Sequence, residues 1–149
     1  MCHKAMSINA RPNRVLISLL WVVVLVGCSG TSTLSEEEVR SEMKSDLSLA
    51  AETTLFIDYI RQSRPTRRYI EGEASYLRDE VNDSVKQFDK ALPETRTENS
   101  INTCKAQLQL LDRELSNVPM ETGNADALAA AKERISAIRN ILEKASSAL

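Results

Sequence analysis

Residues 101–118, INTCKAQLQLLDRELSNV, decide the fold class of this chain. Apolar or thiol side chains recur there in alternating steps of three and four, at Ile101, Cys104, Leu108, Leu111, Leu115 and Val118. This spacing places them on one face of an α-helix, as in helices that pack with nearly parallel axes. The segment therefore predicts a helix over about residues 95–117 that is buried along a narrow stripe, with the thiol of Cys104 inside it.

Three further segments carry a comparable stripe, and we expect helices over about residues 36–63, 66–91 and 125–147. The expected core positions are Val39, Met43, Leu47, Ala50, Thr54 and Ile57 in the first segment, Ile70, Ala74, Leu77, Val81, Val85, Phe88 and Leu92 in the second, and Leu128, Ala131, Ile135, Ile138, Leu142 and Ala145 in the third. The alternating pattern of a half-buried strand never persists in the sequence, so the predicted fold class is all-α.

Local signals mark where these helices begin and end. Ser35 and Glu38 form a capping-box pattern before the first helix, and Asn124 is a good N-cap for the last one. Proline interrupts the helical pattern at three places, which are Pro65, Pro93 and the expected loop over residues 117–123. Proline removes a backbone donor and biases the residue before it away from helical angles, so each place predicts a boundary.

Four helices of about 23 to 28 residues, joined by short loops, favour an antiparallel bundle with up-down-up-down connectivity. Two helical hairpins that complete a shared core by dimerising are the alternative, because similar stripes support both arrangements. The sequence does not separate the two, and the second would make a homodimer the functional unit.

The N-terminal part of the chain has a different pattern. Arg11 and Arg14 precede an almost unbroken apolar run over residues 15–26, which is too short, at about 12 residues, to span a bilayer core. Leu25-Val26-Gly27-Cys28 closes this run, and polar residues follow at once. A basic region, a short apolar run and a small-residue cleavage site are the parts of a secretory signal.

The stretch Leu25-Val26-Gly27-Cys28 resembles the lipobox of bacterial lipoproteins. The resemblance implies that signal peptidase II removes residues 1–27 and that acyl chains on Cys28 bind a membrane. Residues 28–34 would then be a flexible tether, and residues 35–149 a single helical domain. Ser29 is similar to the sorting signal of outer-membrane lipoproteins in Gram-negative bacteria, which implies an outer-membrane location facing the periplasm.

Composition argues against several functions for residues 28–149. Three of the 19 Lys and Arg residues, and none of the 21 Asp and Glu residues, precede Cys28, so the remainder has a net charge of about −5. A nucleic acid is therefore not an expected partner, because binding its phosphates requires a basic surface. The only histidine, His3, lies in the signal, so the usual near-neutral acid, base and metal ligand is missing. We expect no catalytic residue, no metal and no cofactor.

One basic cluster stands out from this acidic background. Four arginines fall within eight residues, at Arg61, Arg64, Arg67 and Arg68. Tyr59 and Tyr69 flank them and could offer stacking faces, and arginine's planar fork suits carboxylates and phosphates. The cluster, with Tyr69, is therefore a candidate partner-binding site. The alternative is that these arginines interact favourably with the negative end of the helix dipole and pair with Asp58, Glu71 or Glu73.

The bundle geometry gives this cluster a location. A helix over residues 36–63 spans about 40 Å, so the arginines are expected at the end far from Cys28. In an up-down bundle the loop at residues 119–123 shares that end, and the loop at residues 93–97 lies near the bilayer.

The predicted function is binding without catalysis, as a scaffold or accessory module of the cell envelope with a protein or cell-wall partner. The first alternative is a carrier that shelters an amphiphile between its helices, lined by Met43, Phe56, Tyr76 and Phe88 together with small residues. The second is an exclusion or immunity lipoprotein of a mobile element, which fits the size and the anchor but has no residue signature.

Overall fold

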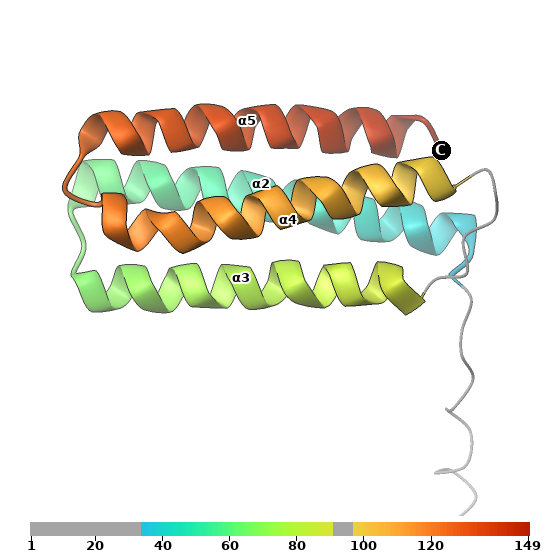
Figure 1. Cartoon of the computed structure of the whole chain (residues 1–149), viewed down its shortest axis with the longest axis horizontal. Helices are drawn as coiled ribbons and strands as arrows, with labels where there is room; N and C mark the ends of the chain where they lie inside the picture. Colours follow the sequence, from blue (N-terminus) through green and yellow to red (C-terminus); the bar gives the residue numbers. More distant parts are fainter. Residues whose placement is uncertain (1–33, 91–96) are drawn as a thin grey trace, which may run out of the picture. The chain divides into compact units, whose positions relative to one another are not determined.

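The computed structural model describes residues 34–90 and 97–149, and these residues form four α-helices (Figure 1). The helices are α2 (Glu36–Ser63), α3 (Arg67–Lys90), α4 (Glu98–Glu121) and α5 (Ala125–Ser147). No β-strand occurs in the described ranges, and all described residues belong to one compact unit, Ser32–Leu149. The predicted all-α class is confirmed.

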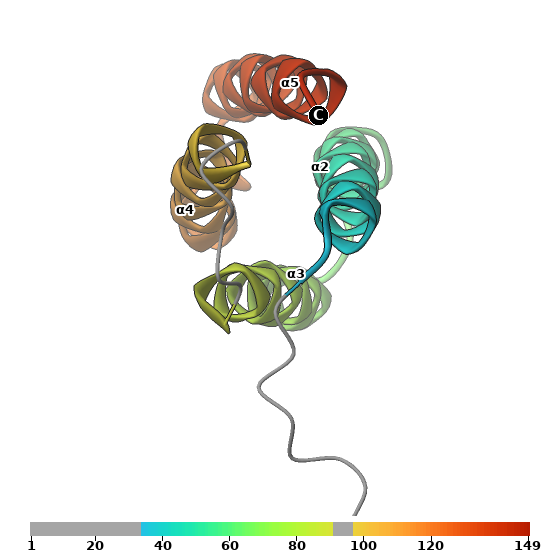
Figure 2. The same ribbon diagram turned by 90° about the vertical axis from the view of Figure 1, so that its right-hand side faces the viewer.

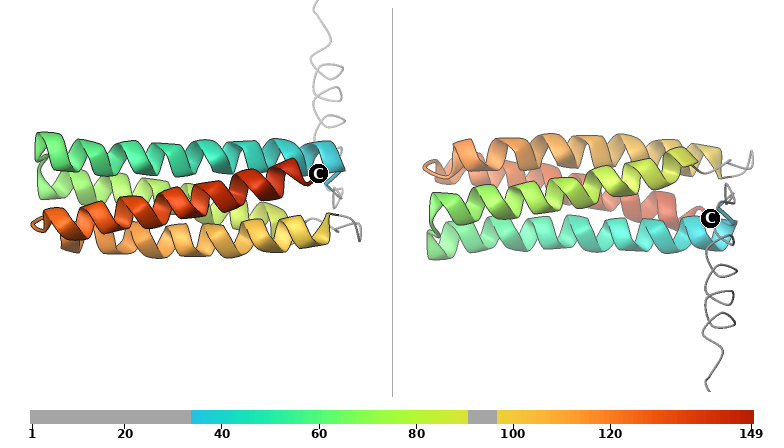
Figure 3. Two further views of the ribbon diagram at one scale, coloured as in Figure 1. Left: turned by 90° about the horizontal axis from the view of Figure 1, so that it is seen from above. Right: turned by 90° about the horizontal axis from the view of Figure 1, so that it is seen from below.

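The four helices form an antiparallel bundle within one chain. In Figure 1, α2 and α4 run in one direction and α3 and α5 in the other, and Figure 3 gives the same arrangement from above and below. Viewed from the end, the helices follow one another around the core in chain order, and α5 packs back against α2 (Figure 2). The up-down-up-down bundle is therefore confirmed, and its core needs no second copy. None of the described helices is long and apolar enough to cross a membrane.

The stripes of α4 and α5 are buried as expected. All six predicted positions on each of these helices have an exposed fraction of 8% or less, and Leu108, Leu111 and Leu115 are fully buried. Burial of large aliphatic side chains is the main stabilising contribution in such a bundle, at roughly 25 cal/mol per Å² of apolar surface. These two helices therefore follow directly from their apolar spacing.

The predicted stripes of α2 and α3 are partly wrong. Leu47, Thr54 and Val85 are only half-buried, and the core positions beside them are occupied by Asp46, Thr53 and Ser84. Apart from Phe56, the buried positions of α2 alternate in steps of four and three from residue 39 to residue 60. Helical geometry, and not the apolarity of each residue, determines which side chains face the core. Polar residues are consequently buried at two positions of α2 and at one position of α3.

The helix starts follow the predicted caps. The backbone N–H of Ser35 donates to Oε2 of Glu38 at 2.7 Å, and the N–H of Glu38 donates to Oγ of Ser35 at 3.3 Å. Oδ1 of Asn124 accepts from the N–H groups of Asp126 and Ala127. Both signals satisfy donors that the first helical turn leaves free.

The expected loop over residues 117–123 is wrong, because α4 continues through Pro119 to Glu121. Proline in a helix removes one hydrogen bond and crowds the preceding turn, but here only two helical residues follow it. Val118, fully buried beside it, holds this last turn against the core. Leu92, Pro93 and the rest of residues 91–96 lie outside the described ranges.

Ion pairs join most neighbouring helices along the outside of the core. They connect Arg78 of α3 with Asp112 of α4, Lys105 of α4 with Asp89 of α3, Arg134 of α5 with Glu114 of α4, and Lys132 of α5 with Asp58 of α2. Within the described residues no ion pair joins α2 to α3. The α2/α3 seam is therefore the side of the bundle that is held without such cross-links.

Candidate functional site

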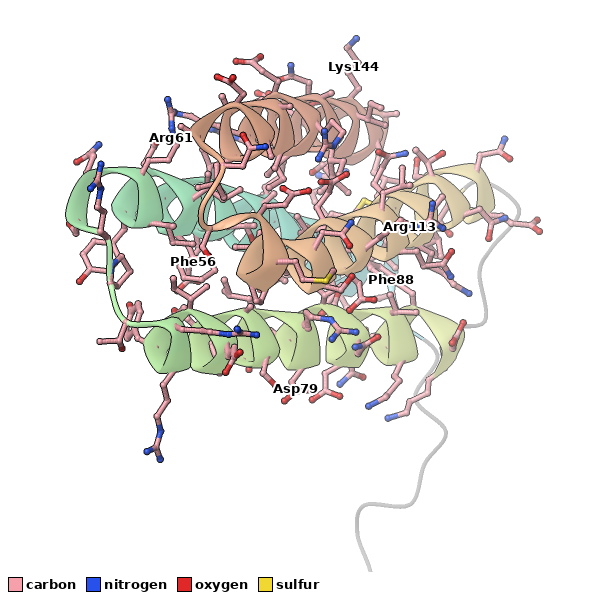
Figure 4. All side chains as sticks on the ribbon, turned by 60° about the vertical axis from the view of Figure 1, so that its left-hand side comes forward. Phe56, Arg61, Asp79, Phe88, Arg113 and Lys144 are labelled. Atoms are coloured by element: carbon pink, nitrogen blue, oxygen red, sulfur yellow. The ribbon has the colours of Figure 1, made fainter. Side chains whose placement is uncertain are left out.

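The predicted arginine cluster lies where two turns meet at one end of the bundle. The α2–α3 turn and the α4–α5 turn surround an open depression of about 790 Å³, which we call the arginine cup. Arg61, Arg64 and Arg67 line it, Thr122 and Gly123 approach from the other turn, and the nearly buried side chains of Ile60, Ile70 and Leu128 lie at its base. Figure 4 shows Arg61 at this end, between α2 and the start of α5. The expectation that both turns share one end is confirmed.

Arg64 has an unusual backbone conformation at the rim of the cup. It is the C-cap of α2 with φ 46° and ψ 57°, and its N–H donates to the carbonyl of Ile60 at 3.2 Å. The boundary before Pro65 is confirmed, although the left-handed conformation is not the extended one that usually precedes proline. Glycine is the usual residue at such a cap, because a Cβ there costs roughly 1–2 kcal/mol. Arg64 therefore occupies a position whose backbone conformation favours glycine.

Replacing Arg64 with glycine is expected to stabilise the protein while it removes a guanidinium from the cup. Relief of the left-handed strain should raise the free energy of unfolding by about 1 kcal/mol. Chemical denaturation of the two proteins measures this difference. Arg64→Ala is the matched control, since alanine removes the same charge but keeps the Cβ. An equal gain in both variants would contradict the strain argument.

Half of the cluster is engaged by neighbouring carboxylates. Nη1 of Arg61 lies 3.8 Å from Oδ1 of Asp58, and Nε of Arg67 donates to Oε1 of Glu71 at 2.7 Å. Within the described residues, Arg64 and Arg68 form no ion pair. Local pairing thus accounts for two arginines, as the alternative interpretation expected, and leaves two without a carboxylate. Of the four, only Arg61 lies in the last turn of α2, where the helix dipole favours a positive charge.

The structure divides the predicted site residues between two surfaces. Arg68 and Tyr69 do not line the cup, and both are exposed on α3. The ring of Tyr69 makes an edge-to-face contact with that of Tyr59, with centroids 5.6 Å apart and planes at 67°. Such a contact stabilises by about 0.5–1.5 kcal/mol beyond burial. The two tyrosines therefore pair with each other across the α2/α3 seam.

The chemistry available in the cup is recognition of an anion. A guanidinium stays protonated under all physiological conditions and offers a planar fork of donors to carboxylate or phosphate oxygens. The cup has no group that changes protonation near neutral pH. Within the described residues, no cluster of His, Cys, Asp and Glu side chains is arranged to hold a metal ion.

A second polar cluster, missed by the sequence reasoning, lies inside the bundle. Asp46 of α2 is 1% exposed, and its carboxylate accepts from Oγ of Ser84 at 2.6 Å and from Sγ of Cys104 at 3.1 Å. Burial raises the pKa of Asp46 to about 6, and the two hydrogen bonds only partly oppose it. Strict continuation of the four-three spacing from Val39 would have placed Asp46 in the core.

Cys104 is a structural thiol. It is fully buried, as predicted, and unpaired. Burial, together with the neighbouring Asp46 carboxylate, raises the pKa of the thiol far above its usual range. The thiolate is the reactive form of cysteine, so this side chain acts as a hydrogen-bond donor in the core.

The residues considered for an amphiphile cavity fill the core or face outward. Met43, Phe56 and Phe88 are buried in the same apolar cluster that closes the bundle. Tyr76 is 53% exposed on the outer surface of α3.

The lipobox and Cys28 lie outside the described residues. No protein-family model matches the chain, and no curated protein or solved structure is significantly similar to it.

Proposed function

We propose that the chain is a lipid-anchored protein of the bacterial envelope that binds a partner and catalyses no reaction. Acyl chains on Cys28 hold it on the outer membrane, facing the periplasm. The apolar run, the Leu25-Val26-Gly27-Cys28 stretch and the following Ser29 support this address. Two or more acyl chains give stable anchoring, since each buried methylene contributes about 0.8 kcal/mol.

The arginine cup is the proposed binding site. It lies at the end of α2 opposite Glu36, the helical residue nearest in sequence to Cys28, and α2 spans about 40 Å. A site at that distance can meet periplasmic partners that do not touch the anchoring membrane. The acidic surface of another envelope protein fits the three guanidinium groups of its wall, and a cell-wall polymer with free carboxylates offers the same chemistry.

The observation that carries the proposal is the placement of Arg64. Its side chain lines the cup without an ion pair in the described part of the chain, on a backbone conformation that disfavours any side chain. A strained residue held by its surroundings is typical of a position that serves binding. Arg61 and Arg67 stand beside it with their charges only partly compensated.

The test is crosslinking in intact cells, followed by affinity recovery of the full-length protein and identification of what it captures. We expect a captured partner to be lost when Arg61, Arg64 and Arg67 are all changed to alanine. The control carries Arg113→Ala and Arg139→Ala, two exposed arginines elsewhere on the bundle, and is expected to capture the partner normally. Unchanged localisation and helix content must accompany the comparison.

Two outcomes would overturn this proposal. Capture of the same partner by all three proteins would assign binding to a helical face and leave the cup arginines with a local structural role. Recovery of no protein or cell-wall fragment with any of them would favour the carrier alternative, which predicts a lipid that copurifies in a stoichiometric amount.

A further inference from the structure

The outer surface of α3 carries a second stripe, on the side away from the core. Tyr69, Gly72, Tyr76, Asp79 and Asp83 recur in alternating steps of three and four, and all five are exposed. Figure 4 shows Asp79 pointing away from the bundle. The same spacing that buries the inner stripe therefore presents a continuous outer stripe to solvent.

The part of this outer stripe from Tyr69 to Tyr76 is aromatic. The exposed fractions are 45% for Tyr69 and 53% for Tyr76. On α2, Tyr59 is 45% exposed and contacts Tyr69, and Leu55, one turn before Tyr59, is 68% exposed. Four large exposed side chains gathered on neighbouring helices in this way are typical of an interaction site. Tyrosine is among the residues enriched at protein interfaces.

Gly72 lies between Tyr69 and Tyr76 on the outer stripe, and the fold gives it no role. It is inside α3, and a Cβ built there would meet nothing within 4 Å. Glycine inside a helix costs about 1 kcal/mol relative to alanine. A glycine flanked by two tyrosines on an exposed face does, however, let the backbone of another helix approach closely.

Charge is distributed asymmetrically about Gly72. Arg68 lies on one side, about 6 Å along the helix axis, and Asp79 lies about 10 Å away on the other side. In the described part of the chain neither side chain has an ion pair. An antiparallel copy of α3 crossing at Gly72 would bring each Arg68 near the partner's Asp79, and each Tyr69 near the partner's Tyr76. A parallel copy would place arginine against arginine.

We propose that the outer stripe of α3 is a two-fold interface, on which a second copy of this chain docks in antiparallel orientation about Gly72. An isologous contact needs a surface that complements itself. Arg68 at one end, the two tyrosines between and Asp79 at the other end satisfy this condition, whereas Asp83 already pairs with Lys86. The arginine cup is not part of the interface, because Arg68 does not line it. The proposal is therefore independent of the partner proposed for the cup.

Disulfide crosslinking of full-length protein in intact cells tests the geometry. Gly72→Cys places a thiol near the two-fold axis and fits without a clash, so mild oxidation is expected to give a covalent dimer. Asn140→Cys, exposed on α5 across the bundle, is the control and should remain monomeric. Cys104 cannot compete because it is fully buried.

Charge reversal in the Gly72→Cys background tests the pairing. Arg68→Glu and Asp79→Arg, each alone, are expected to lower the dimer yield by about tenfold, since each sets like charges against each other twice. The double variant restores opposite charges with unchanged net charge and should recover the dimer. The proposal would be overturned if Gly72→Cys gave no dimer, or if the single charge reversals left the dimer yield unchanged. A product with a mass other than two copies would assign the stripe to a different protein.

Discussion

With the proposed lipid anchor, changing Cys28 to serine is expected to abolish acylation and to remove the protein from the outer membrane. Serine keeps the size of the side chain but cannot form the thioether that carries the diacylglycerol. We expect the variant to lose all incorporated fatty-acid label and to retain residues 1–27. Metabolic labelling, the mass of the recovered protein and membrane fractionation measure these three results.

The size of this effect follows from the surface that the acyl chains bury. Each methylene contributes about 0.8 kcal/mol in the bilayer, so the loss of two chains is far larger than the effect of a typical point mutation. Cys104→Ala is the control, because it removes the other cysteine downstream of the signal and should keep full labelling. Label that persists in Cys28→Ser would show that the lipobox is not used.

Most of the fold could be predicted from spacing, and the wrong core positions Leu47 and Val85 share one cause. The stripes of α4 and α5 are apolar at every position, so their buried faces are read without ambiguity. In α2 and α3 the apolar residues Leu47 and Val85 lie one position after Asp46 and Ser84. A reading based on apolarity chooses the former, whereas helical geometry buries the latter. The polar pair then satisfies itself through a 2.6 Å hydrogen bond.

The candidate site was predictable as a cluster but not as a surface. The sequence predicts a cluster of arginines at a helix end, and the arginines are found there. Which arginines line the cup depends on the left-handed turn at Arg64 and on the approach of the α4–α5 turn. The second of these is not local, because tertiary packing brings together residues that are about 60 positions apart in the sequence. Arg68, only one residue after Arg67, consequently faces a different surface.

The free energy of unfolding is expected to fall as the pH rises through about 6, because the buried carboxyl group of Asp46 then loses its proton and becomes charged in the core. Its pKa is about 6 in the folded protein and 3.8 in an unfolded chain. The folded state therefore binds more protons between these values. The contribution is fully present below about pH 4 and is lost above about pH 6. A difference of about two pKa units corresponds to about 3 kcal/mol.

Asp46→Asn should remove this dependence. The amide oxygen can still accept from Ser84, and no charge needs to be buried, so we expect a gain of about 2 kcal/mol at pH 7.5 and a flat profile between pH 4.5 and 7.5. Glu133→Gln, at an exposed position of α5, is the control and should keep the slope of the parent protein. Urea denaturation at several pH values measures the free energy of unfolding of all three proteins. A parent protein with constant stability from pH 4.5 to 7.5 would contradict the assignment.

A carboxylate that lowers stability at neutral pH is then best explained as the hydrogen-bonded link between α2, α3 and α4, which fixes the register of a seam that no ion pair holds.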